Sequence, residues 1–216
     1  VSGASQKLSN LLKKVDTPQL PLMRPVLPDA DTLLPFLRRI DENRHYTNFG
    51  PLQAELIKKL LELQPRANNA ALYGVCASSA TAALELALAA LNLPRGSRIG
   101  LPALTFIATA SAIVRCGHVP TVFDVDLHDW MLKPAMLSEH HQSLAAVVPV
   151  ATFGMPQDAH AWSLWSKSTG IPVIIDAAGA IGAQAIAPGV TAVFSLHATK
   201  PVSSGEGGFI VTEDAE

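Results

Sequence analysis

Residues 171–180 read IPVIIDAAGA, and the run Val173–Asp176 inside them decides the fold class. Its three aliphatic residues are β-branched, and the run is bounded by proline on one side and by aspartate on the other. An uninterrupted apolar run of this length is typical of a strand that is buried on both faces of a sheet. We therefore expect a parallel strand in the interior of an α/β fold.

Short apolar runs and helical segments alternate on both sides of this strand. The other expected strands are Arg98–Leu101, Thr121–Asp124, Ala145–Val150, Ala192–Leu196 and Phe209–Thr212. The expected helices are Thr32–Asp41, Leu52–Leu63, Ala80–Leu93, Ile107–Cys116 and Ala159–Ser168. This alternation predicts a layered α/β fold with a largely parallel sheet. The helix over Ala80–Leu93 is apolar on almost all sides, so we expect it to be buried.

The N-terminal part differs from the rest of the chain. Leu8–Val15 favours a short helix, and the run Asp16–Asp31 holds four prolines, which favour an extended arm. We expect residues 1–45 to form this helix and arm, and residues 46–216 to form the main domain. The chain opens at Val1 rather than at Met, so we expect it to be part of a longer protein.

The composition excludes several classes of protein. Hydrophobic residues make up 49% of the 216 residues and charged residues 16%, which is typical of a folded globular chain. The net charge of −2 favours neither nucleic acid nor an anionic membrane as a partner. Cys76 and Cys116 lie in apolar runs without metal-ligand spacing, so we expect two buried thiols, no metal site and a cytoplasmic protein.

Two charged residues stand just beyond expected strands. Asp176 ends a buried strand, where a carboxylate either caps the following turn or faces a cation in a cleft. Lys200 follows the strand in FSLHATK, residues 194–200. A lysine in that place is either a solvated loop residue or the amine of a Schiff-base enzyme.

Three further segments allow a functional and a structural interpretation. Ser78–Thr81 begins a helix, where hydroxyl residues cap the helix and free N–H groups can bind a phosphate. Phe106 is either a core aromatic or a platform for a flat ring. The glycines of Gly205–Gly208 indicate a tight turn or a close backbone approach, and they lack the spacing of a dinucleotide site.

Together these segments resemble the DegT/DnrJ/StrS family of aminotransferases, which depend on pyridoxal 5'-phosphate (PLP) and mostly act on nucleotide-linked keto-sugars. Six blocks in family order carry the resemblance. They are TNFGPLQAELIKKL (47–60), SSATAALELALAALNLPRGSRI (78–99), LPALTFIATASAIVRCGHVPTVFDVD (101–126), VVPVATFGMPQDAHA (147–161), VIIDAAGAIGA (173–183) and FSLHATKPVSSGEGGFIVT (194–212). The resemblance implies the three-layer αβα large domain of PLP-dependent transferases, without the C-terminal small domain that relatives carry.

The resemblance also implies a role for each matching residue. Lys200 falls on the lysine that forms the Schiff base with the cofactor aldehyde, and Asp176 on the partner of the pyridine nitrogen. Phe106 falls on the aromatic that stacks on the ring. Ala80, Thr81 and Ser195 fall on phosphate-binding positions, and Asn48–Pro51 on a segment at the active-site mouth.

The activity implied is transfer of an amino group from an amino acid, often glutamate in this family, to a keto-sugar by a homodimer. Dehydratase relatives carry histidine in place of the lysine, so Lys200 favours amination. The chain departs from the family pattern at Ala80, Ala151 and Gly179, where glycine, histidine, and glutamine or histidine are common. A non-catalytic homologue with a structural or regulatory role, and a different PLP reaction on the same fold, remain the alternatives.

Overall fold

A computed structural model of the chain describes residues 23–66 and 69–215. Within these residues, seven strands form one sheet in the order β1-β7-β6-β5-β4-β2-β3. The strands are β1 (Tyr73–Ala77), β2 (Arg98–Pro102), β3 (Val119–Phe123), β4 (Ala146–Val147), β5 (Val173–Asp176), β6 (Val190–Ser195) and β7 (Gly208–Thr212). The strands from β6 across to β3 pair in parallel, and β7 runs antiparallel to both β1 and β6. The predicted α/β class with a largely parallel sheet is confirmed.

The five predicted helices that fall within the described residues are present, with ends that differ from the predicted ones by a few residues. They are α2 (Ala30–Asn43), α3 (Pro51–Glu62), α4 (Ala80–Ala90), α5 (Ile107–Arg115) and α6 (Ala159–Thr169). Side-chain caps fix several of the starts: the Asp29 carboxylate accepts from Thr32 N at 2.8 Å, and the Asp158 carboxylate accepts from Ala161 N at 2.9 Å. Across residues 23–66 and 69–215, no helix combines the length and the apolar character needed to cross a bilayer.

Helices cover both faces of the sheet, as the alternation of side chains along the buried strands requires. In β5, Val173 and Ile175 face the cluster that contains Trp162 of α6, and Ile174 faces the cluster that contains Leu88 of α4. All five side chains are almost fully buried. The molecule therefore has three layers, with the sheet between α6 and the pair α4 and α5.

The strand predictions need correction at two points: one strand was missed and one is too long. Strand β1 was not predicted, because YGVCA contains a glycine and half of its side chains face solvent. The predicted strand Ala145–Val150 is wrong in length, since the ladder covers β4 and continues only as a single bridge between Val150 and Asp176. Pro149 interrupts the run and lacks a backbone N–H to donate, which explains the early end.

The burial expected for α4 is also corrected. Ala83, Leu84, Ala87 and Leu88 are buried, but Leu86 on the opposite side is 52% exposed. Helix α4 therefore packs on the sheet through one face only.

The two thiols are likewise less buried than expected: Cys76 and Cys116 are both free and only partly buried, and burial raises the pKa of each.

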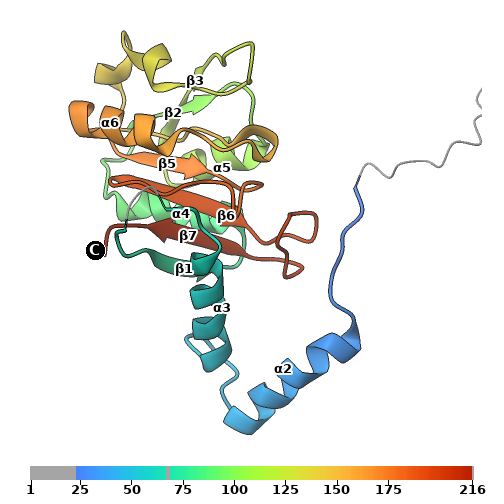
Figure 1. Cartoon of the computed structure of the whole chain (residues 1–216). Coiled ribbons are helices and arrows are strands. Elements are labelled where there is room, and N and C mark those ends of the chain that lie inside the picture. The colour runs from blue at the N-terminus through green and yellow to red at the C-terminus, as the bar shows by residue number, and fades with distance from the viewer. Residues whose placement is uncertain (1–22, 67–68, 216) are drawn as a thin grey trace, which may run out of the picture.

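Helix α2 stands apart from the layered body, at the far end of α3 (Figure 1). None of its residues is buried, although Leu33, Leu34 and Leu37 give it an apolar face. An ion pair between Arg39 and Glu55, 2.7 Å long, joins it to α3. The predicted helix Leu8–Val15 lies outside the described residues, and residues 23–29 of the predicted arm form neither helix nor strand.

Candidate functional site

The residues predicted to carry chemistry gather at one edge of the sheet, where the parallel strands have their carboxyl ends. Asp176 is the last residue of β5 and only 5% of it is exposed. Its Oδ2 accepts a hydrogen bond from the Thr109 hydroxyl at 2.6 Å, and its Oδ1 accepts from Ala178 N at 3.2 Å. No helix follows Asp176, so its carboxylate does not cap a helix. It binds instead Ala178, in the turn that follows, and Thr109, in the first turn of α5.

Burial raises the pKa of the Asp176 carboxyl above its ordinary value near 3.8, because the charged form loses its hydration. The hydrogen bonds from Thr109 and Ala178 act in the opposite direction, and so does the positive charge of Lys200. The hydrogen-bond donors to this carboxylate within the described part of the chain are both neutral. A buried carboxylate with neutral donors favours a cation as a further partner.

Thr109 is a member of this site that the sequence did not identify. Its side chain is 1% exposed, and a second hydroxyl, that of Thr105, lies 2.7 Å from its own. The sequence signal that could have identified Thr109 is a polar residue on the inward face of the first turn of an apolar helix. Only the folded arrangement, in which α5 packs on α4, β2 and β3, shows that this hydroxyl reaches the carboxylate at the end of β5.

The start of α4 forms a second part of the edge. The Ser79 side chain caps the helix by accepting from Ala82 N at 3.1 Å, so the structural interpretation of this serine is confirmed. Ala80 and Thr81 are the first helical residues, and an α-helix leaves its first backbone N–H groups without partners inside the helix. These groups and the helix dipole favour an anion at this point.

Gly208 explains how closely the last strand approaches this helix start. A Cβ atom at Gly208 would overlap the Ser79 carbonyl group, and it would lie 2.8 Å from Ala80 N. Strand β7 can therefore pass α4 only because Gly208 has no side chain. The close backbone approach predicted for the glycine run is present at this residue.

Ser195 joins the two parts of the edge. It ends β6 next to Gly208 of β7, and its side chain is almost fully buried. Its backbone N–H donates to Ala178 O at 3.4 Å, and its Oγ accepts from His197 N at 3.2 Å. Ser195 therefore lies between the helix start at Ala80 and the turn that follows Asp176.

Lys200 lies in the loop between β6 and β7, in a turn that its own N–H closes by donating to His197 O at 2.9 Å. The side chain is partly buried, so the simple solvated-loop interpretation does not describe it. Lys200 follows β6, in which Val193 pairs with Asp176, and its positive charge lowers the pKa of the Asp176 carboxyl.

Phe106 is 77% exposed and directly precedes α5, so the interpretation as a core aromatic is wrong. It stands three residues before Thr109, whose hydroxyl binds Asp176. An exposed ring beside a buried carboxylate is the arrangement expected of a platform for a flat ligand.

The two departures Ala151 and Gly179 lie in segments next to the backbone of Asp176. Ala151 N donates to Asp176 O at 2.9 Å. A Cβ atom at Gly154 would lie 2.8 Å from Gly179 O, so the two backbone segments are in close contact. Phe153 between them has a positive φ of 53° and is 85% exposed, with its ring against Trp130 at 5.9 Å. Ala151 thus binds the backbone of Asp176, and Gly154 joins this segment to Gly179.

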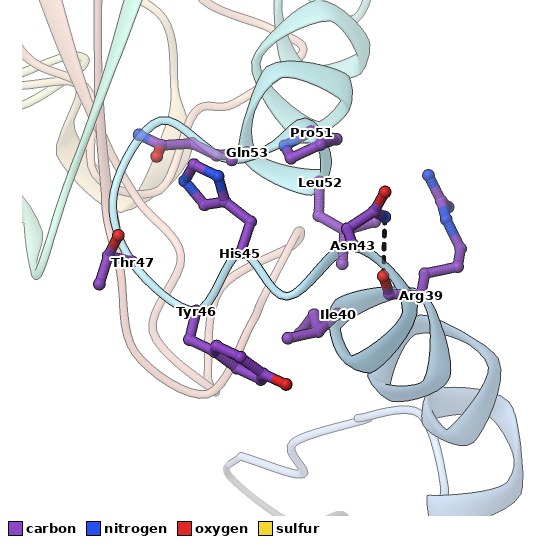
Figure 2. Close-up of a pocket in the computed structure, with 10 residues that line it drawn as sticks. Arg39, Ile40, Asn43, His45, Tyr46, Thr47, Pro51, Leu52 and Gln53 are labelled. Atoms are coloured by element: carbon purple, nitrogen blue, oxygen red, sulfur yellow. Dashed lines mark hydrogen bonds between the residues drawn. The ribbon is translucent and has the colours of Figure 1, made fainter.

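The mouth segment Asn48–Pro51 contributes to a different cavity, of about 340 Å³, between α2 and α3 (Figure 2). Its lining residues are Arg39, Ile40, Asn43, His45, Tyr46, Thr47, Gly50, Pro51, Leu52 and Gln53. The rings of His45 and Tyr46 project from the link between the helices, and Asn43 donates to Arg39 O at 2.7 Å. None of these lining residues belongs to the strands that carry Asp176 and Ser195.

Several solved structures share this fold. A protein of Bacillus cereus ATCC 10987 that is named as a PLP-dependent aminotransferase matches 90% of this chain at 29% identity, with a TM-score of 0.79. DesI, solved with its TDP-sugar product, matches 91% at 31% identity and a TM-score of 0.77. 3-Amino-5-hydroxybenzoic acid synthase matches 92% at 26% identity and a TM-score of 0.77.

The match covers 55%, 50% and 52% of those three proteins, so this chain spans about half their length. The sequence model of one family matches residues 30–216, which include every residue of the edge described above. The chain belongs to the DegT/DnrJ/EryC1/StrS aminotransferase family.

Proposed function

We propose that this chain is the PLP-binding part of an aminotransferase that moves an amino group from an amino acid, glutamate in the first instance, to a nucleotide-linked keto-sugar. The observation that carries the proposal is the Asp176 carboxylate, which is almost fully buried, is held by two neutral donors and lies near Lys200. The sugar-nucleotide part of the proposal is supported by DesI, which was solved with a TDP-sugar.

The residues of the edge fit this cofactor in charge and in shape. A protonated pyridine nitrogen would supply the cation that the buried Asp176 favours, and it would bring the pKa of that carboxyl down again. The N–H groups at Ala80 and Thr81, with Ser195 beside them, suit a phosphate. The exposed ring of Phe106 suits stacking on a flat heterocycle.

PLP, when bound, supplies a ring that withdraws electrons from the carbon next to the substrate nitrogen. Asp176 keeps the ring nitrogen protonated, which increases that withdrawal. Lys200 would hold the cofactor aldehyde through its Nζ amine and would give way to the amine of the donor. Once free, Nζ would be the group that takes up a proton as a base and returns it as an acid.

The division of the chain follows from these roles. We propose residues 46–216 as the large, PLP-binding domain and residues 1–45, predicted as a helix and a Pro-rich arm, as a separate N-terminal part. We expect a homodimer, a proposal supported by the exposed apolar side chains Leu86, Ile107 and Val114 on α4 and α5. The two free thiols support a reducing compartment, the cytoplasm.

Covalent labelling tests the proposal. The purified chain is mixed with PLP, its visible absorbance is recorded, and borohydride then fixes the cofactor for peptide mapping. We expect a new absorbance band and a label on Lys200, both lost in Lys200→Ala and both kept in Lys167→Ala, a change at an exposed lysine of α6. A label spread over surface lysines would refute the proposed site.

Glutamate then separates transamination from the alternatives. Added to the PLP-loaded chain, it should convert the cofactor to its pyridoxamine form, which is read from the absorbance. A label on Lys200 without this conversion would instead support a non-catalytic homologue or another PLP reaction.

A further inference from the structure

The loop that carries Lys200 is held together by hydrogen bonds between its two arms. Leu196 N donates to Gly207 O at 2.9 Å, and Ala198 N donates to Gly205 O at 2.8 Å. Ser204 N donates back to Leu196 O at 2.9 Å. These bonds hold the two arms of the loop together beyond the last β6–β7 pair, Ser195 with Gly208.

The ring of His197 adds a side-chain link within its own arm. Its Nδ1 accepts from Thr199 N at 3.3 Å and lies 2.8 Å from the Thr199 hydroxyl. Its Nε2 faces Glu206 Oε1 on the returning arm at 3.6 Å, which is too long for a hydrogen bond.

These contacts surround the turn from which the Lys200 side chain leaves. His197 O accepts from Lys200 N, and Thr199, the residue that the ring binds, immediately precedes the lysine. The His197 side chain is 44% exposed, so it contributes little to the core. Its clearest effect is to fix the conformation of the four residues from His197 to Lys200.

We infer that His197 is a positioning residue for Lys200: through Thr199 its ring fixes the turn that presents the lysine amine to the edge with Asp176. The effect of this positioning on the reaction depends on the proposed function. The geometry it describes belongs to the cofactor-free chain and is measurable there.

Acetylation of the cofactor-free chain tests the geometry. The rate at which acetic anhydride modifies Lys200, relative to the exposed Lys167, is followed by mass spectrometry. We expect His197→Ala to raise this relative rate about fivefold, the factor equivalent to the typical net worth of one hydrogen bond. His197→Asn should restore most of the protection, because its side-chain oxygen can accept from Thr199 N.

A second measurement uses PLP. The PLP concentration that gives half-maximal borohydride-fixed label on Lys200 should rise about fivefold in His197→Ala and return toward the original value in His197→Asn. His160→Ala, at an exposed histidine of α6, is the matched control and should change neither reading. The thermal unfolding midpoint of each variant shows whether an effect is confined to the loop.

The inference is overturned if His197→Ala leaves both readings unchanged, or if His197→Asn behaves like His197→Ala. The two proposals fail separately. A chain whose Lys200 takes no PLP label refutes the proposed function, whereas the acetylation rates still decide the role of His197.

Discussion

Helices α2 and α4 carry similar aliphatic side chains and have opposite environments. Helix α4 lies on the sheet and buries four residues, among them Leu88, which is fully inaccessible. Helix α2 buries none, and its Leu37 is 54% exposed. The difference is the surface beside each helix: α4 faces β5, β6 and β7, whereas α2 is linked to the body through α3.

The comparison teaches that an apolar helix face does not by itself bury a helix. Most helical stability in a protein comes from packing against another element rather than from intrinsic propensity. Helix α4 also brings its first turn to Gly208 and thereby to the candidate site. Helix α4 therefore contributes both to the stability of the fold and to the candidate site. Substitutions at different positions can measure these two contributions separately.

The largest effect is expected from Leu88→Ala. The change removes a fully buried side chain from the contact between α4 and the sheet, and such truncations cost about 2–5 kcal/mol. Urea unfolding of the cofactor-free chain measures this loss. A loss below about 1 kcal/mol would mean that α4 is not held by the sheet as described.

A smaller effect, of the opposite sign, is expected from Asp176→Asn. Because burial raises the pKa of this carboxyl, its ionised form costs folding free energy at every pH above the raised value. The amide removes that cost, so the cofactor-free variant should be more stable at pH 7 by roughly 1–3 kcal/mol. The gain should shrink as the pH falls through the raised pKa and vanish well below 3.8, where the carboxyl is protonated in both the folded and the unfolded state.

Urea unfolding at pH 7 and at pH 4 measures this gain. Asp158→Asn, at the exposed cap of α6, is the control and should change stability little, since asparagine caps as well as aspartate does. The stabilised Asp176→Asn variant should also lose its PLP label on Lys200. Equal stability of the variant and the original chain at both pH values would contradict a costly buried charge.

The smallest effect is expected from Leu37→Ala in α2, which is the same chemical change as in Leu88→Ala. Leucine and alanine have similar helix propensities, and the leucine is half exposed, so unfolding free energy should change by no more than about 0.5 kcal/mol. A loss above about 2 kcal/mol would show that a further surface covers α2 in solution, and the contrast between the helices would then disappear.

Much of the fold was predictable because its signals are local. Strand β5 was predicted at its observed bounds, since Pro172 and the small residues after Asp176 mark both ends. Strand β1 was missed, because its pairing with β7 depends on residues far away along the chain. The exposed side of α4 was missed because composition does not tell which neighbours surround a helix.

The candidate site was predictable to the same extent. Asp176 and Lys200 were identified from their places after apolar strands, and the structure brings them to one edge. The bond from Thr109 to Asp176 and the contact of Gly208 with the start of α4 were not, because both join segments distant in the sequence. Such contacts follow from the packing of helices on the sheet, which local patterns do not specify.

The pairing of β1 with β7 also has a consequence for folding during protein synthesis. Among the described strands β1 comes first along the chain and β7 last, with roughly 130 residues between Ala77 and Gly208. At about 5–20 residues per second, a ribosome needs on the order of ten seconds to make that stretch. Throughout that time β1 lacks its strand partner, and the start of α4 lacks its contact with Gly208. This side of the sheet therefore forms only after β7 has left the ribosome.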